Sequence, residues 1–130
     1  MGEISPEDLA VTCAHVVDER KAEDINVLRV APLSTITDYF VIATGRNVRQ
    51  LQAFVRALDE RLEEIGAKVY GVEGEAESGW ILIDAGDAIV HMFSPEKREL
   101  YALEMLWGSC DTVDWSGKQP LVAEDSAEQE

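Results

Sequence analysis

Asp84 and Asp87 are the residues of this chain whose type and spacing come closest to a catalytic arrangement. Paired carboxylates on one face of a strand can hold a divalent metal, and this needs a separation of two residues because side chains two apart point the same way. Asp84 and Asp87 are three apart, with Gly86 between them in a segment typical of a tight turn. The spacing therefore argues against a metal centre, and we assign no metal ligand.

Other arrangements that carry chemistry are also missing from the sequence. The segment ATGRN at residues 43–47 contains one glycine, so it lacks the glycine-rich loop that cradles phosphates. No order of serine, histidine and aspartate suggests a nucleophile, and Cys13 and Cys110 have no metal-like spacing. A disulfide between these two is disfavoured in a reducing compartment. We therefore expect no catalytic residue and no cofactor, and a protein that is not an enzyme.

The charge balance favours a protein partner over nucleic acid. The chain has 26 acidic and 11 basic residues, which give a formal net charge of −15. Nucleic-acid binding gains its strength mainly from cationic side chains that release counterions from phosphates. Contact with RNA or DNA over a broad surface is therefore not expected, whereas a basic protein would be attracted from a distance. Acidity that only keeps the protein dissolved is the alternative.

The length and the two ends of the chain predict one domain without a membrane segment. One core suffices for 130 residues, and no apolar stretch approaches the roughly 20 residues that span a bilayer. The acidic start MGEISPEDL lacks the features of a signal peptide. We expect a cytoplasmic protein, or an organellar one if a transit peptide has been removed. Residues 5–110 should form the domain, and residues 111–130 a flexible acidic tail.

Capping residues and apolar spacing predict three helices. They are expected at residues 5–21, 47–65 and 94–107. Asn47 is the N-cap of the second helix, and Gly66 supplies its left-handed stop. The third helix should run unbroken to Trp107, with Leu103, Leu106 and Trp107 in the core.

Five strands are expected, at residues 24–30, 39–43, 67–72, 80–84 and 88–93. Residues 39–43 form an unbroken apolar run, typical of a central strand that is covered on both faces. The last two strands flank Ala85, Gly86 and Asp87, which predicts an antiparallel hairpin. Residues 73–79 are interpreted as a polar loop. The order α-β-β-α-β-β-β-α predicts an α+β fold with a mixed five-stranded sheet and helices packed on it.

Two aromatic residues are candidates for binding a partner. Trp80 follows a polar loop and begins a strand, so its ring could lie partly exposed at the sheet edge or cap the core. Tyr101 lies about one residue off the apolar stripe of its helix, so its hydroxyl could face a partner or bond inward. An exposed aromatic side chain is an effective anchor at an interface.

Three aspartates are the polar candidates. Asp84 and Asp87 could meet cations of a partner, or they could bond nearby backbone N–H groups as turn residues do. Asp38 precedes the central strand and could either cap backbone groups or face the partner. His91 lies between apolar neighbours in the middle of a strand, which favours a hydrogen-bonded structural histidine over a ligand.

Four blocks of the sequence carry a family pattern. The first is KAEDI at residues 21–25, and the second is STITDYFVIATGRNVRQ at residues 34–50. The third consists of VEG at residues 72–74 followed by GWILIDAGDAIVHMF at residues 79–93, and the fourth is RELYALEMLWG at residues 98–108. In order and separation, these blocks resemble the RsfS/Iojap family of ribosomal silencing factors. Residues from 109 onward match no part of the pattern.

The resemblance implies a fold, a partner and an activity. The fold would be similar in topology to nucleotidyltransferases. RsfS-like proteins bind the large ribosomal subunit at the large-subunit protein numbered fourteen and prevent the small subunit from joining, which lowers translation when nutrients are short. Organellar relatives take part in assembly of the large subunit. Two positions, Ala85 and Ala102, depart from the residues common in the family, and they affect the detail of an interface.

For this chain the resemblance implies a translation repressor with Trp80, Tyr101, Asp84, Asp87 and Asp38 at the partner-binding surface. It favours the outward orientation of Tyr101. A large-subunit assembly factor stays open as an alternative, as does a dimeric adaptor or nucleotidyltransferase-like protein without ribosomal contact. A homodimer is compatible with the sequence in each case.

Overall fold

Strand β2 (Tyr39–Thr44) lies inside the sheet and is buried along its whole length. It pairs antiparallel with β1 (Glu23–Arg29) and parallel with β5 (Ala88–Phe93). Neighbours on both sides supply the ladder hydrogen bonds, and the apolar side chains of residues 39–43 suit burial on both faces. The expected central strand is confirmed.

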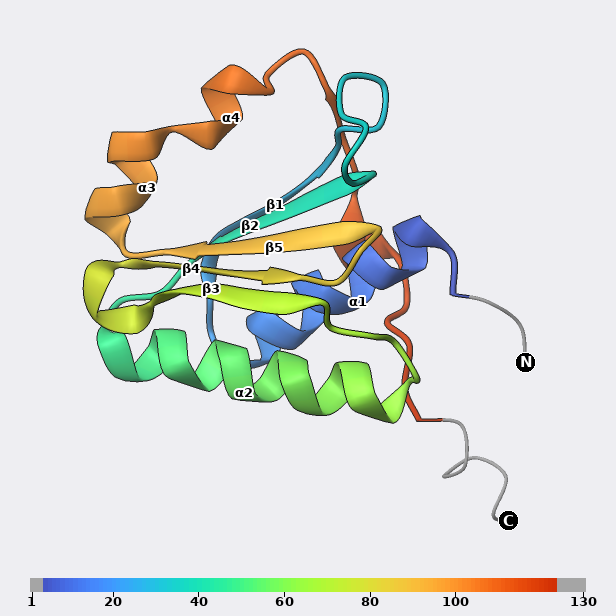
Figure 1. Ribbon diagram of the computed structural model, residues 1–130, viewed down its shortest axis with the longest axis horizontal. Helices are drawn as coiled ribbons and strands as arrows, with labels where there is room; N and C mark the ends of the chain where they lie inside the picture. The colour runs from blue at the N-terminus through green and yellow to red at the C-terminus, as the bar shows by residue number, and fades with distance from the viewer. Residues whose placement is uncertain (1–3, 124–130) are drawn as a thin grey trace.

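A computed structural model describes residues 4–123 of the chain (Figure 1). The remaining strands are β3 (Gly71–Glu75), β4 (Trp80–Asp84) and β6 (Asp111–Thr112). The helices are α1 (Pro6–Glu19), α2 (Val48–Glu64), α3 (Pro95–Tyr101) and α4 (Leu103–Leu106), with 3₁₀ turns at Ala76–Ser78 and Trp115–Gly117. The sheet is mixed, as expected, but it has six strands in the order β3-β4-β5-β2-β1-β6 rather than five. Within residues 4–123, no helix has the length and apolar character needed to cross a membrane.

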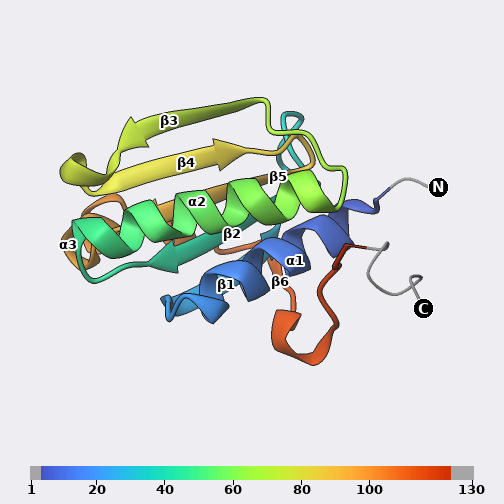
Figure 2. The same cartoon turned by 90° about the horizontal axis from the view of Figure 1, so that it is seen from below.

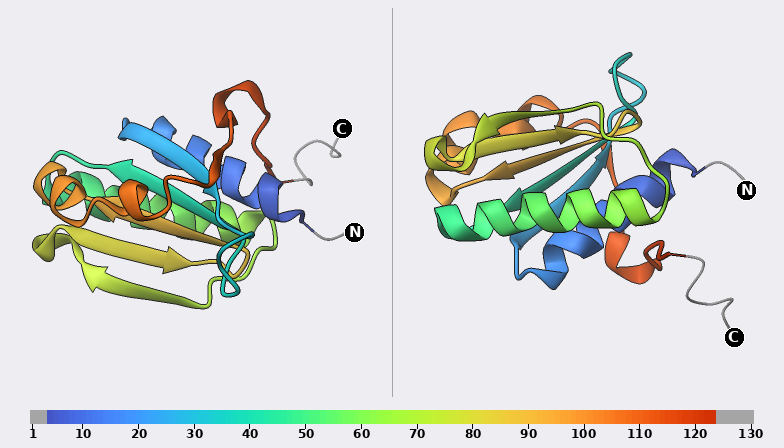
Figure 3. Two further views of the ribbon diagram at one scale, coloured as in Figure 1. Left: turned by 90° about the horizontal axis from the view of Figure 1, so that it is seen from above. Right: turned by 60° about the horizontal axis from the view of Figure 1, so that its bottom comes forward.

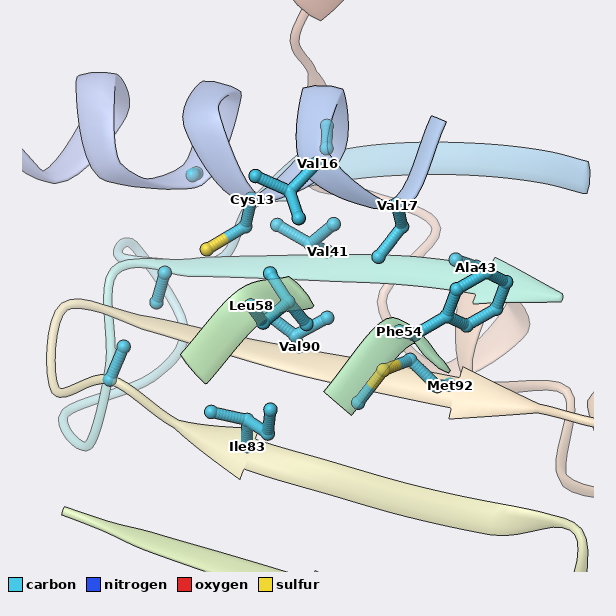
Figure 4. Packing of buried hydrophobic residues seen from close by; sticks show 14 of the residues in the cluster. Cys13, Val16, Val17, Val41, Ala43, Phe54, Leu58, Ile83, Val90 and Met92 are labelled. Atoms are coloured by element: carbon cyan, nitrogen blue, oxygen red, sulfur yellow. The ribbon is translucent and has the colours of Figure 1, made fainter. Parts of the chain in front are cut away.

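Helices α1 and α2 cover one face of the sheet (Figures 1 and 2). The main core lies between these two helices and the sheet. Figure 4 shows Val41, Val90 and Met92 of the sheet beside Phe54 and Leu58 of α2. All five of these side chains are fully buried. Burial of this apolar surface is the main favourable term that holds the two helices on the sheet.

The opposite face of the sheet is covered over only part of its width. A second, smaller core forms around Phe40 and Phe93, and Leu103 and Trp107 pack against it. The rings of Phe40 and Trp107 meet edge to face, with their centroids 5.2 Å apart. Seen from above in Figure 3, α3, α4 and the chain after them leave β3 and much of β4 uncovered. Helices therefore cover one face of the sheet more fully than the other.

The third expected strand lies four residues later than predicted. Residues 67–70 are not in a strand, and β3 occupies Gly71–Glu75, so it overlaps the predicted strand at residues 71–72 and continues into the segment interpreted as a loop. This segment has two glycines and two glutamates, which have low strand propensity, so its own composition does not reveal the strand. Pairing with β4 determines it, because all five residues of β3 are in register with Trp80–Asp84.

The prediction of one long third helix is wrong. The helix breaks at Ala102, which adopts the left-handed conformation with φ 47° and ψ 49°. The break turns the chain so that Leu103 and Trp107 reach the second core. Leu106 points away from the sheet and is 73% exposed, so its assignment to the core was also wrong.

The segment after residue 110 packs against the body of the protein up to the last described residues. Strand β6 pairs with β1, and the backbone N–H of Leu121 donates to the hydroxyl of Thr12 in α1 at 2.9 Å. The indole N–H of Trp115 donates to the Ile25 carbonyl at 3.4 Å. The packed part of the chain therefore extends beyond residue 110, where the sequence pattern placed the start of a tail. The rest of that tail, residues 124–130, lies outside the described residues.

Candidate partner-binding face

Trp80 begins β4 and forms the centre of an aromatic cluster. Its ring stacks on Phe93 of the neighbouring strand at 5.3 Å between centroids, and it lies 4.5 Å from the ring of Tyr101 in a tilted arrangement. The indole is half-buried, so one edge stays accessible. The structure thus combines both interpretations of Trp80, because the ring caps the second core and also reaches the surface.

Tyr101 ends α3 and is 42% exposed. With Trp80 it lines a hollow of about 290 Å³ at the surface. The other residues around this hollow are Glu73, Gly74, Ser78, Leu82 and Lys97. The hollow is open and partly apolar, and it has charged side chains of both signs at its rim. Such a shape suits an inserted side chain of a protein partner.

Alternation along β4 puts Trp80, Leu82 and Asp84 on the same side of the sheet. Ile81 and Ile83 are buried in the main core on the opposite side, which fixes the direction of the other three. We call the surface formed by Tyr101, Trp80, Leu82 and Asp84 the open face. From Trp80 to Asp84 it extends over about 13 Å, at roughly 3.3 Å per strand residue.

The three aspartates gather at the far end of the open face from Tyr101. The Asp84 carboxylate accepts a hydrogen bond from the Gly86 backbone N–H at 2.9 Å, so it stabilises the β4–β5 turn. The carbonyl of Asp87 accepts from the backbone N–H groups of Asp38 and Tyr39, at 3.2 and 3.1 Å. These bonds join two connections of the sheet through the backbone, and the exposed Asp87 carboxylate stays at the surface.

His91 lies directly beneath this face and holds the indole of Trp80. The Trp80 Nε1–H donates to His91 Nδ1 at 3.3 Å, so the neutral imidazole carries its proton on Nε2. Burial lowers the pKa of His91 to about 4, which keeps the ring uncharged near neutral pH. Within residues 4–123 its Nε2 has no hydrogen-bond partner. The residue is therefore structural, as its apolar neighbours predict.

Arg98 positions the helix that carries Tyr101. Its guanidinium forms a two-pronged ion pair with Glu104 of α4 and also donates to the Thr44 hydroxyl at 2.7 Å. Burial raises the pKa of Glu104, but hydrogen bonds from Arg98 and Asn26 outweigh it, and the pKa ends below its ordinary value. This network attaches α3 and α4 to the end of β2, and so fixes the ring of Tyr101 over Trp80.

Comparison with known proteins gives the chain a family. Residues 3–130 match the family described as "Ribosomal silencing factor during starvation". The chain belongs to this family. A ribosomal silencing factor of Halalkalibacterium halodurans is 36% identical over 114 residues, which cover 88% of this chain and 97% of that protein. Names of this kind describe regulation of the ribosome rather than a chemical reaction.

Silencing-factor relatives also include a solved structure and organellar proteins. A crystal structure of a Chromobacterium violaceum protein is similar to this fold with a TM-score of 0.76, at 30% identity and with 98% of each chain covered. A mouse protein named for mitochondrial assembly of the ribosomal large subunit is 36% identical over 92 residues, which cover 68% of this chain and 40% of that protein. Chloroplastic Iojap of Arabidopsis thaliana matches as well.

In this member of the silencing-factor family, the described part of the chain has no cluster of metal-binding side chains, and both cysteines are free. No group of three or more His, Cys, Asp or Glu side chains within residues 4–123 is arranged to hold a metal. Burial raises the pKa of Cys13 to about 12, so its thiol stays protonated and unreactive. Cys110 is a free cysteine as well.

Sequence reasoning missed several residues around the open face. Leu82 could have been found from the two-residue period that it shares with Trp80 and Asp84. Lys97 had no signal, because only the turn into α3 brings it beside the hollow. The break at Ala102 also exposes three apolar residues near this surface, which are Leu100, Met105 and Leu106.

Proposed function

We propose that this ribosomal silencing factor binds the large ribosomal subunit through the open face and prevents the small subunit from joining. The observation that carries the proposal is the pair of accessible rings of Trp80 and Tyr101, 4.5 Å apart, beside the part of the sheet that α3 and α4 leave uncovered. Aromatic side chains held rigidly at a surface lose little entropy on binding, and they commonly dominate the energy of an interface. A role at the ribosome would place the protein in the cytoplasm.

The proposed contact is a basic ribosomal protein, the large-subunit protein numbered fourteen that the family pattern implies. The net charge of −15 would attract such a protein over a long range and speed the encounter. Glu73 lies at the rim of the hollow, and Asp84 lies on the same face. Both carboxylates could then meet cations of the partner at short range.

Asp87 and Asp38 belong to the proposed surface at its outer end. A specific interface of ordinary size covers about 800 Å² on each partner. This is wide enough to reach from Tyr101 past Asp84 to the exposed carboxylate of Asp87. Charges at the rim change the association rate more than the affinity. We therefore assign the affinity to the two aromatic rings and a steering role to the aspartates.

In this mechanism the protein acts by occupying a surface, and it is not an enzyme. Asp84 and Asp87 come closest to a catalytic pair, but they flank a turn. The Asp84 carboxylate accepts a hydrogen bond from the Gly86 backbone N–H in that turn. A rigid domain seated on the large subunit is sufficient to exclude the small subunit by volume.

The test is co-sedimentation with purified large subunits. We expect Trp80→Glu and Tyr101→Ala each to lower the affinity by about 2 kcal/mol or more, roughly 30-fold. Val72→Ala is a matched control, because Val72 is an exposed apolar residue of β3 whose in-register partner is Ile83, not Trp80. Unchanged binding by a folded Trp80→Glu, Tyr101→Ala double variant would place the contact on another face.

A second candidate function is assembly of the large subunit. The name of the mouse mitochondrial relative favours it. The two functions differ in the particle that is bound. An assembly factor would co-sediment with immature large-subunit precursors in preference to mature subunits, and its removal would make precursors accumulate.

A further inference from the structure

The positive charges of this acidic chain gather at one end of the fold. Arg20 and Lys21 follow α1, Arg46 and Arg49 lie at the start of α2, and Arg56 lies two turns further along α2. All five residues are exposed. They are almost half of the 11 cationic residues in a molecule with a net charge of −15.

Gln50 holds the segments that carry these cations together. Its side-chain amide donates to the carbonyls of Arg20 and Lys21 at 3.0 and 3.1 Å. Its side-chain oxygen accepts from the Arg46 backbone N–H at 2.6 Å. Arg20 and Arg56 also line the same shallow hollow, whose rim carries the carboxylates of Asp59, Glu60 and Glu63 as well. Arg49 is seven residues before Arg56, so the two lie on one face of the helix.

Most of these cations form no direct ion pair within the described chain. Arg46 pairs with Glu23 at 2.7 Å, and nearby Glu19 pairs instead with Arg61 at 3.1 Å. In residues 4–123, no carboxylate lies within ion-pair distance of the other four, Arg20, Lys21, Arg49 and Arg56. We call these four residues the basic corner.

We propose that the basic corner contacts RNA phosphates of the large ribosomal subunit while the open face contacts a protein. Three of its four residues are arginines, and a planar guanidinium group can donate two parallel hydrogen bonds to two oxygens of one phosphate. A basic protein partner would be repelled by this corner, so the corner does not serve the contact assigned to the open face. The patch is small, and the prediction against broad nucleic-acid binding is unaffected.

The two proposed contacts lie at the same end of the fold but on opposite faces, because α1 and α2 cover the face of the sheet that is turned away from the open face. The basic corner lies where α1 ends and α2 begins, at the same end of the sheet as α3 (Figures 1 and 2). Trp80 begins β4 at this end, and its ring lies 4.5 Å from the ring of Tyr101 of α3. A particle built of RNA and basic proteins would have to enclose this end of the fold to meet both surfaces in one docked orientation. This inference rests on the proposed function.

The test measures binding of the full chain to purified large subunits across a range of salt concentrations. The variant Arg20→Gln, Arg49→Gln, Arg56→Gln removes three cations of the corner. The control Arg29→Gln, Lys68→Gln, Lys118→Gln removes three cations outside it. Arg29 lies at the Tyr39 end of β1, Lys68 follows α2, and Lys118 pairs with Glu7 in α1. Both variants change the net charge equally.

We expect the corner variant to bind at least tenfold more weakly at low salt. Each phosphate contact contributes about 0.9 to the slope of log affinity against log salt, so the slope should become shallower by roughly two to three. The control should keep the wild-type slope. Tighter or unchanged binding by the corner variant, or an equal loss in both variants, would overturn the inference. So would a loss of self-association, which would make the corner an interface between copies.

A second measurement separates this inference from the proposed function. If the wild-type chain does not bind large subunits, the proposed function fails. A titration with a short RNA duplex at low salt, followed by backbone amide NMR, still tests the corner directly. Shifts confined to residues around 20, 21, 49 and 56 would support it, and their absence would overturn it.

Discussion

The indole N–H of Trp80 donates to Nδ1 of His91, 3.3 Å away, so a buried neutral imidazole supports the ring that we propose as the main anchor. His91 is 6% exposed and packs edge to face with Phe40. The bond needs a lone pair on Nδ1, which protonation of that nitrogen would remove. The orientation of the surface indole is therefore linked to the charge state of a residue beneath it.

This link makes stability depend on pH in a defined direction. Burial lowers the pKa of His91 from 6.5 to about 4. Between these values the unfolded chain binds a proton that the folded chain does not, so the free energy of unfolding falls as the pH falls. The loss attributable to His91 should approach about 3 kcal/mol at pH 4 and vanish above pH 7. Urea denaturation of the wild type and His91→Gln at several pH values measures it. Parallel pH curves for the two proteins would contradict this assignment.

Gly74 gives a prediction about the edge of the open face. It has φ 87°, and a Cβ built on it would lie 2.2 Å from the carbonyl oxygen of Trp80. Gly74→Ala should therefore separate β3 from β4 and destabilise the protein by about 2 kcal/mol or more. Gly71 in the same strand has nothing within 4 Å of such a Cβ, so Gly71→Ala is the control. Equal melting temperatures for the two variants would refute the predicted clash.

Arg98 gives a prediction about the position of Tyr101. Arg98→Met removes the ion pair with Glu104 and the hydrogen bond to Thr44. Hydrogen bonds to charged groups contribute about 1.5 to 3 kcal/mol each. We expect faster amide hydrogen exchange in α3 and α4, and weaker binding to large subunits, while α1 and α2 keep their protection. Unchanged exchange in α3 would show that packing alone holds this helix.

Trp115 gives a prediction about the segment after residue 110. Its ring meets His15 edge to face at 5.1 Å between centroids, and its indole donates to the Ile25 carbonyl. Trp115→Ala should lower the free energy of unfolding by about 2 kcal/mol, less than at a fully buried tryptophan. Thermal unfolding measures the loss. If deletion of residues 111–130 left the melting temperature unchanged, this segment would have no part in stability.

Sequence reasoning succeeded where a local signal determines the structure. Asn47 accepts the Gln50 backbone N–H at 2.9 Å, and Gly66 takes the left-handed conformation that ends the α2 region. Sequence reasoning failed where a segment becomes a strand only by pairing with another strand that is distant in the sequence. Strand β3 forms only because β4 pairs with it, and the two residues of β6 form only because β1 is adjacent. No short window of sequence contains those partners.

The same distinction between local and distant signals applies to the candidate site. The residue types suggested Trp80 and Tyr101 as candidates, but the contact between their rings depends on the left-handed turn at Ala102 and on the Arg98 network. Alanine carries no signal for that conformation. The basic corner escaped notice because its cations come from two segments that Gln50 joins, within a chain whose overall charge is strongly negative.

Formation of whole ribosomes from purified large and small subunits tests the central claim most directly. Saturating amounts of the wild-type chain should leave the two subunits separate on a sucrose gradient, whereas Trp80→Glu at the same dose should let them join. Complete joining in the presence of saturating wild-type protein would contradict the account.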